Sequence, residues 1–463
     1  YHVVISSGAV GLAELNGFNV TKGNANENST FNVNGNLLYK FGGGGMYNFL
    51  SSPSIINCTF SGNTASNGGG MFNSSSSPSI TNSKFSGNVA NNSGGGMYNV
   101  QNSYPIVTNT TFLGNSAVND GGGMYNSSSS PSITKSKFSG NVATYNGGGI
   151  CNEYSSPTIS NIIFAGNYAY YYGGGMNNYY SSPIITNSTF SGNTASNGGG
   201  MSNLYSSFSN VSNSIFYGNS SGFFNYYSTP DITYSIIQGG YTGIGNQDVD
   251  PIFVYAPSYT TAPFTGGDFS LLTCSPAINA GNNALIPFGI TTDIDGNPRI
   301  YETTVDMGAH EYQPPQSFAN IITAEPINSI VCAGRASSFS IIAKYDPTYQ
   351  WQINTGSGFV NINNDTTYSG ANTSTLDISK ATSVIEGYTF RVIAIKCDLN
   401  DTSEIVSMSI IPDTLYVKQG ATGNGTSWAN ASGDLQLMIN QACANLEIWV
   451  AAGTYKPNRP ANN

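Results

Sequence analysis

The sequence predicts an all-β protein organised around a parallel β-helix, in which every coil adds one short strand to each of several stacked sheets. The first observation is a repeat in residues 41–225, where a glycine triplet precedes Met46, Met71, Met97, Met124, Ile150, Met176 and Met201, in steps of 25, 26, 27, 26, 26 and 25 residues. The second is that each repeat holds three short β-prone runs between turn residues and no window for an amphipathic helix. A fixed period of this length indicates a solenoid.

Equivalent residues of successive coils should stack along the axis about 4.8 Å apart. The Met column is then internal. So are a Phe column (Phe60, Phe85, Phe112, Phe138, Phe164, Phe190, Phe216) and an aliphatic one (Ile55, Ile80, Val107, Ile133, Ile159, Ile185, Val211). We place a corner near Asn57, because Ile55 and Phe60 both point inward only if the chain turns between them. The glycine triplets allow a tight bend without Cβ clashes.

Two asparagine columns are predicted to be structural ladders, in which each amide bonds its copies in the neighbouring coils and tolerates left-handed backbone at a bend. The alternative, a catalytic role for these asparagines, is disfavoured by their regularity. The first column is Asn48, Asn73, Asn99, Asn126, Asn152, Asn178 and Asn203, and the second is Asn63, Asn88, Asn115, Asn141, Asn167, Asn193 and Asn219.

The motifs Gly-Gly-Gly-Met-Tyr-Asn at 43–48 and Phe-Ser-Gly-Asn at 60–63 resemble motifs of right-handed parallel β-helix repeat proteins of the bacterial surface. They are similar to repeats of large secreted Bacteroidetes proteins and, more distantly, of chlamydial polymorphic outer-membrane proteins. The resemblance covers about 180 residues. It implies a secreted, cell-surface protein, exported by a type IX-like route.

Composition excludes several partners. The chain has 463 residues, 14 Lys and Arg, 24 Asp and Glu, and a net charge of −10. The few scattered basic residues make nucleic acid and an anionic membrane improbable, and no apolar run is long enough to span a bilayer. The chain opens on Tyr1 within a strand-like run, so we expect a slice of a longer protein whose neighbouring modules belong to the same polypeptide.

We divide the chain into a β-helix at 1–245, a closing segment at 246–316, an Ig-like domain at 318–411 and the start of a second β-helix module at 412–463. Residues 2–6, 12–20 and 31–39 are interpreted as earlier, less regular coils. Pro314–Pro315 marks a linker. The last part reads as a strand, a short helix capped near Asp434 and a strand, and it resembles the N-terminal cap of such β-helices.

The closing segment is rich in acids and contains Asp293-Ile-Asp-Gly-Asn297-Pro-Arg299 and Val305-Asp-Met-Gly-Ala-His-Glu-Tyr312. These motifs are similar to motifs in the C-terminal segment of bacterial β-helix proteins of the choice-of-anchor Q type. A β-helix needs such a segment to blunt its last coil. Asp293, Asp295 and Asn297 would suit a structural Ca²⁺ site; the alternative is an Asp-Gly turn in which Arg299 pairs with Asp306 or Glu311. No other cofactor is expected. The chain has too few suitable ligands for a metal site built from Cys and His, since its two histidines, His2 and His310, are far apart in the sequence.

Residues 318–411 have strands at sandwich spacing, with Trp351 where a core tryptophan belongs. The domain resembles Ig-like modules of secreted Bacteroidetes proteins. Phe390 occupies the position at which antibody domains keep a cysteine, so the usual disulfide is missing. Cys332 and Cys397 are a candidate disulfide if the protein folds outside the cytoplasm.

Three functions stay open. A polysaccharide lyase or hydrolase of the β-helix type needs clustered carboxylates, whereas Asp120 and Glu153 are single acids in different repeats and different columns, so we expect no catalytic residue. An adhesin-like glycan-binding or surface-protein-binding module would use an outward aromatic column, which also fits plain stacking between coils; its residues are Tyr47, Phe72, Tyr98, Tyr125, Tyr179 and Tyr180. A stalk would bind nothing.

Overall fold

A computed structural model describes residues 2–9, 11–313, 321–397, 399–444 and 446–456. The chain divides into two compact units, residues 1–315 and 316–463. The linker predicted at Pro314–Pro315, and with it the predicted boundary between residues 316 and 318, lies outside the described residues.

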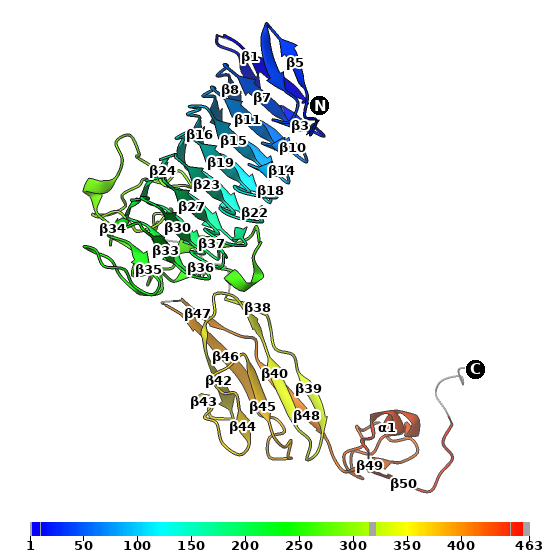
Figure 1. Ribbon diagram of the computed structural model, residues 1–463. Coiled ribbons are helices and arrows are strands. Elements are labelled where there is room, and N and C mark those ends of the chain that lie inside the picture. The colour runs from blue at the N-terminus through cyan, green and yellow to red at the C-terminus, as the bar shows by residue number, and fades with distance from the viewer. Residues whose placement is uncertain (1, 10, 314–320, 398, 445, 457–463) are drawn as a thin grey trace. The chain divides into compact units, whose positions relative to one another are not determined.

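The first unit is a parallel β-solenoid whose coils stack strand on strand (Figure 1). Three sheets have nine strands each and a fourth has six. We name them by their inward residues. The Met sheet comprises β1 (Val4–Ser7), β7 (Met46–Phe49), β11 (Met71–Ser74), β15 (Met97–Val100), β19 (Met124–Ser127), β23 (Ile150–Glu153), β27 (Met176–Tyr179), β30 (Met201–Leu204) and β33 (Phe223–Tyr226).

The Ile sheet follows along each coil and comprises β2 (Glu14–Asn16), β8 (Ser54–Ile56), β12 (Ser79–Thr81), β16 (Ile106–Thr108), β20 (Ser132–Thr134), β24 (Thr158–Ser160), β28 (Ile184–Thr186), β31 (Asn210–Ser212) and β34 (Asp231–Thr233). The Phe sheet comprises β3 (Asn19–Thr21), β9 (Thr59–Ser61), β13 (Lys84–Ser86), β17 (Thr111–Leu113), β21 (Lys137–Ser139), β25 (Ile163–Ala165), β29 (Thr189–Ser191), β32 (Ile215–Tyr217) and β35 (Ile236–Ile237). The short Ala sheet comprises β4 (Asn24–Ala25), β10 (Thr64–Asn67), β14 (Val89–Ser93), β18 (Ser116–Ala117), β22 (Val142–Ala143) and β26 (Tyr168–Ala169).

The predicted columns are in register and buried. Met71 pairs with Met97, Ile80 with Val107, and Phe85 with Phe112. The Met, aliphatic and Phe columns form one apolar core, and successive Phe rings stack, for example Phe112 on Phe138 at 4.5 Å between centroids. The parallel β-helix of about 26-residue coils is therefore confirmed.

Both asparagine ladders form. In the first, Nδ2 of each asparagine donates to Oδ1 of the next, as from Asn48 to Asn73 at 2.8 Å. In the second, the amide also donates to a Phe carbonyl, as from Asn88 to Phe60 at 2.9 Å. Left-handed backbone does not fall on the ladder residues, contrary to our expectation. It falls beside them, at Gly62 with φ +61°, and at the predicted corner, Asn57, with φ +53°.

The N-terminal residues differ from the prediction in one respect. Strands β1 to β4 form a regular first coil paired with β7 to β10. Residues 31–39 are not a coil: β5 (Thr30–Val33) and β6 (Asn36–Tyr39) form an antiparallel hairpin. Leu38 of this hairpin is fully buried against Tyr47 and Phe72 on the outer face of the Met sheet, because those large apolar rings offer a surface that the hairpin removes from water.

The closing segment contains β36 (Phe253–Tyr255), η1 (Tyr259–Thr261), β37 (Asp268–Leu271) and η2 (Asn283–Leu285). Just before this segment, Tyr241 packs against Phe223 of the last coil, at 5.7 Å between ring centroids. The first residues of the segment cover the last coil, which is the role we expected: Gln247 pairs in parallel with Ile236 of β35, and the Ile237 amide donates to the Gln247 carbonyl at 2.9 Å. The rest of the segment covers the outer face of the Phe sheet. The Phe264 amide donates to the Gly166 carbonyl at 3.2 Å, and Ile163 and Ile215 are buried with Phe269 and Met307.

A β-sandwich occupies most of the second unit. One sheet holds β39 (Ser329–Cys332), β48 (Val406–Ile411), β46 (Thr389–Lys396), β42 (Thr348–Asn354), β43 (Phe359–Asn361) and β47 (Leu399–Thr402); the other strands are β40 (Ser337–Ser340), β45 (Thr375–Ile378) and β44 (Tyr368–Ser369), with a pair β38 (Ile322–Ala324) and β41 (Ile342–Ala343). Trp351 is fully buried, as predicted, and its indole N–H donates to the Thr373 carbonyl at 3.0 Å.

The C-terminal part consists of β49 (Thr414–Val417), α1 (Leu435–Gln441) and β50 (Glu447–Val450), and the two strands pair in parallel. The predicted helix cap is present, since the Asp434 carboxylate accepts a hydrogen bond from the Leu437 amide at 3.0 Å. Leu415, Val417 and Met438 form its small core. Among the described residues, no helix has the length and apolarity that crossing a membrane requires.

Candidate binding site

The candidate site is a cavity of about 540 Å³ on the outer face of the Met sheet. We call it the tyrosine cleft. Twelve residues line it: Asp120, Tyr125, Asn146, Cys151, Glu153, Tyr172, Asn177, Tyr179, Leu204, Tyr205, Phe224 and Tyr226.

The cleft arises from a change in one outward column. The second residue of each Met-sheet strand faces outward, and this column reads Tyr47, Phe72, Tyr98, Tyr125, Cys151, Asn177, Ser202 and Phe224 in register. Three consecutive small residues therefore replace aromatic rings between Tyr125 and Phe224. The missing ring volume leaves a hollow in the face of the sheet.

The sides of the cleft come from two neighbouring columns. The fourth residue of each strand also faces outward, which places Glu153, Tyr179, Leu204 and Tyr226 along one side. Asp120, Asn146 and Tyr172 stand on the other side, in the turns that lead into the glycine triplets. Tyr180 lies beside the cleft, 42% exposed, and stacks on Tyr205 at 5.7 Å between centroids.

The predicted aromatic column thus divides into two parts. Tyr125 and Tyr179 line the cleft, but Tyr47 and Phe72 are only 2% and 6% exposed under the β5–β6 hairpin. Tyr98 packs against Phe72 at 5.1 Å and joins the same cluster. Our interpretation of Tyr47 and Phe72 as a solvent-facing binding surface is wrong, because an apolar hairpin covers them.

Two carboxylates that we expected to stand alone meet in the cleft. Asp120 accepts a hydrogen bond from Nδ2 of Asn146 at 2.8 Å, and Glu153 accepts one from the Tyr125 hydroxyl. Burial raises the pKa of Asp120, and the charge of Glu153 raises it further. Burial also raises the pKa of Tyr98 to about 12 and that of the Cys151 thiol, so both stay protonated at neutral pH. None of the twelve described lining residues is basic.

Sequence reasoning missed the cleft as a site because Asp120 and Glu153 are 33 residues apart and occupy different columns. The signal that would have located it is the run Cys151, Asn177, Ser202 within an otherwise aromatic column. Tyr205, Tyr226 and Phe224 then follow as neighbours in the same coils.

The predicted calcium ligands, Asp293, Asp295 and Asn297, lie in a hydrogen-bonded turn. Asp293 is fully buried, and its carboxylate accepts hydrogen bonds from the amides of Asp295 at 3.0 Å, Asn297 at 2.8 Å and Glu311 at 3.0 Å. The side chain of Asn297 turns its nitrogen toward Asp293, at 3.3 Å. Asp293 thus organises the turn that we gave as the alternative, and a Ca²⁺ site there stays a prediction.

His310 joins this group, although its sequence position gave no sign of it. Its Nδ1 lies 2.8 Å from Oδ2 of Asp295, and this contact lowers the pKa of Asp295. Ligand atoms of Asp293, Asp295 and His310 all lie within 4.8 Å of one another. The guanidinium of Arg299 pairs with Glu311 at 3.4 Å, and both side chains are buried.

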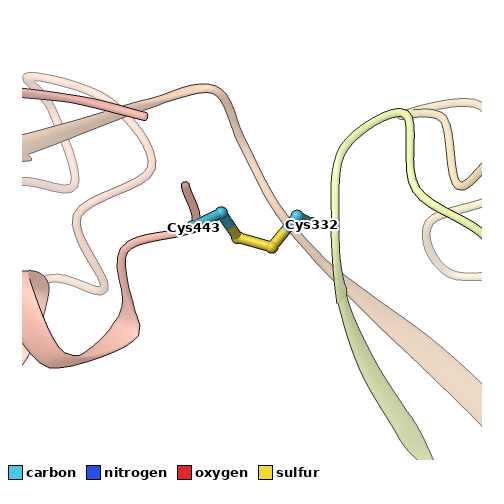
Figure 2. The surroundings of a disulfide bond; sticks show 2 residues. All are labelled: Cys332 and Cys443. Carbon is cyan, nitrogen blue, oxygen red and sulfur yellow. A yellow bond between two sulfur atoms is a disulfide. The ribbon is translucent and has the colours of Figure 1, made fainter. Parts of the chain in front are cut away.

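The predicted Cys332–Cys397 disulfide is wrong. Cys332 is bonded to Cys443, with 6.1 Å between their Cα atoms (Figure 2). Topology explains the difference. Cys332 ends β39 and lies opposite Ile411, where the chain leaves the sandwich for β49, whereas β46 runs antiparallel to β48 and carries Cys397 toward the other end.

The comparison with solved structures matched parts of this chain, at low TM-scores. No protein-family model and no curated protein matches the chain. Among the solved structures that match part of it are titin M4 in a trigonal form (18% identity, TM-score 0.17, 19% of this chain and 93% of that one), tandem Ig repeats of Dlar (16%, 0.17, 20% and 48%) and the Ig-like domain of human leucine-rich repeat-containing protein 4 (14%, 0.18, 22% and 95%). The chain is a parallel β-solenoid protein that carries an Ig-like sandwich.

Proposed function

We propose that this chain is a non-catalytic module of an extracellular, cell-surface bacterial protein and that it binds glycans in the tyrosine cleft. The observation that carries the proposal is the cleft, a hollow of about 540 Å³ with five tyrosines in its lining. Small-molecule sites have volumes of about 300–1,000 Å³ and combine aromatic walls with a few polar groups. The secreted bacterial origin follows from the resemblance of the repeats.

A sugar ring suits this chemistry because its faces are apolar and its edges carry hydroxyls. Tyr179, Tyr205 and Tyr226 supply flat faces, with Tyr205 and Tyr226 at 5.3 Å between ring centroids. The carboxylate of Glu153 and the amide of Asn146 supply polar partners at the sides, and the amide of Asn177 supplies one at the bottom. Such a surface holds a saccharide by stacking and hydrogen bonding.

A polysaccharide-degrading activity is the second candidate, favoured by one observation: Asp120 and Glu153 line the same cavity. Glycosidases use a pair of carboxylates, one of them protonated as general acid. Here Glu153 is held by the Tyr125 hydroxyl and Asp120 by the Asn146 amide, an arrangement that suits fixed acceptors better than groups that must exchange protons during a reaction. A stalk without a ligand is the third alternative.

The test is binding of the full chain to a glycan array, followed by titration of the best ligand. The Tyr179→Ala/Tyr226→Ala double variant should bind at least tenfold more weakly, and Tyr104→Ala, which removes an exposed tyrosine that does not line the cleft, should bind as the wild type does. Release of reducing sugar from polysaccharides would favour the enzyme. An array with no bound glycan would contradict the proposal and leave the stalk.

A further inference from the structure

Charge is distributed unevenly around the solenoid. Between residues 41 and 245 the charged residues are three lysines and three acids: Lys84, Lys135, Lys137, Asp120, Glu153 and Asp231. Lys84 and Lys137 lie on strands of the Phe sheet, and Lys135 lies at the corner between the Ile and Phe sheets. Two of the three acids line the tyrosine cleft. Within residues 41–245, two of the three acids therefore lie on the outer face of the Met sheet and none of the three lysines does; the closing segment carries further acids over the Phe sheet.

One carboxylate oxygen of the cleft is left without a hydrogen-bond donor in the described part of the chain. Oε2 of Glu153 accepts from Tyr125, while its Oε1 has no hydrogen-bond partner among the described residues. This acceptor belongs to a residue that lines the cleft together with the Asp120 carboxylate. A ligand that fits must bring hydrogen-bond donors and, best, a positive charge.

From this arrangement we infer that the tyrosine cleft selects saccharides that carry a free protonated amine, such as oligomers of de-N-acetylated hexosamine, over N-acetylated or uronate-containing ones. An ammonium group offers three donors and no acceptor, which matches the unpaired oxygen of Glu153 and the carboxylate of Asp120. Its charge is attracted to the carboxylates and to tyrosine ring faces. A uronate would place a third negative charge beside Asp120 and Glu153, which is unfavourable in a partly buried site. The inference rests on the proposed glycan binding and adds the ligand class.

The experiment is calorimetric titration of the full chain with three hexasaccharides: a β-linked glucosamine oligomer, its fully N-acetylated counterpart and an oligouronate. It is run in EDTA at a pH at which the amine is protonated. We expect the glucosamine oligomer to bind at least tenfold more tightly than the N-acetylated one, and the oligouronate to bind least. Glu153→Gln should abolish the preference, with Asp120→Asn as the second variant if Glu153→Gln does not fold. Asp231→Asn removes an exposed acid that does not line the cleft and should keep the preference.

The outcomes separate the two proposals. Equal affinity for the amine and N-acetyl forms would overturn the amine inference and leave glycan binding intact. Absence of binding to all three saccharides and to the array would overturn both. A tetralysine peptide that binds as tightly as the glucosamine oligomer would show that the cleft recognises amines without a sugar, and would also overturn the inference.

Discussion

Asn126 donates from Nδ2 to Oδ1 of Asn152 at 2.9 Å while its own Oδ1 accepts from Asn99 at 2.8 Å. Each buried amide of this ladder thus depends on the coil before it and the coil after it. Buried polar groups are costly when they are left unpaired. The ladder therefore specifies the register of the coils, because a slip of one residue would leave many of its groups without partners.

Asn126→Ala should destabilise the solenoid strongly. It leaves Nδ2 of Asn99 and Oδ1 of Asn152 unpaired, at a cost of about 1–3 kcal/mol for each group. Asn92→Ala removes an exposed asparagine that bonds Asn67 at 2.9 Å and should change stability by less than about 0.5 kcal/mol. Urea unfolding followed by hydrogen exchange of the solenoid peptides measures both. Equal effects of the two variants would show that the ladder does not stabilise the coils.

Alanine should not be tolerated at the glycines of the triplet that lie against the backbone of a neighbouring coil. A Cβ on Gly148 would meet the carbonyl oxygens of Gly174 and Tyr168 in the next coil, and that backbone has no room to move without breaking ladder bonds. Gly114 is a matched control, since its φ is +59° but a Cβ there would lie in open space. Gly114→Ala should cost about 1–2 kcal/mol from backbone strain alone. Gly148→Ala should cost more in the same urea experiment; a smaller effect would mean that the coils can separate freely.

The repeating part of the fold could be predicted because its signal is redundant. Phe112 and Phe138 occupy equivalent positions in consecutive repeats, and a parallel coil is the arrangement that stacks them as rings 4.5 Å apart while also aligning the Met and Asn columns. Each column confirms the period of the others. The same holds for the corner at Asn57, where a turn is needed to point Ile55 and Phe60 inward together.

The non-repeating parts could not be predicted in the same way. The sequence around Leu38 does not indicate that this side chain packs on Tyr47, and the sequence around Phe264 does not indicate that its amide bonds Gly166. Such contacts depend on where an irregular segment folds back. The binding site depends on them too: the hairpin hides the first aromatic residues and leaves the later ones accessible. The cleft itself reflects absent side-chain volume at Cys151 and Asn177, which periodicity does not report.

The disulfide should tether the small C-terminal part. The Cys332–Cys443 bond spans a sequence separation of 111 residues, and closing a loop of this order stabilises by roughly 4–5 kcal/mol in the loop-entropy model. The core formed by Leu415, Val417 and Met438 is small. Cys443→Ser should therefore raise hydrogen exchange in β49, α1 and β50 and leave the sandwich core around Trp351 protected. Asn440→Ser, an exposed change on α1, should not. Peptide mapping without reduction should recover Cys332 joined to Cys443; recovery of Cys332 joined to Cys397 would contradict the structure.

Glu311 should make the stability of the first unit depend on pH. Burial, with the charge of Asp306 as the next cause, raises the pKa of Glu311 from 4.5 to about 7. Because the folded state then holds this proton more tightly than the unfolded state, the stabilising contribution is complete below pH 4.5 and is lost as the pH rises through about 7. The denaturant midpoint of this unit, read from hydrogen exchange of its peptides, should therefore decrease as the pH rises from about 5 to about 7.5. Glu311→Gln removes the titrating group and should flatten this part of the profile, although it also weakens the contact with Arg299. Glu302→Gln changes an exposed acid that bonds Asn279 at 3.0 Å and should keep the wild-type slope. A midpoint that rises with pH over this interval would show that the pairing with Arg299 outweighs burial and keeps Glu311 ionised in the folded protein.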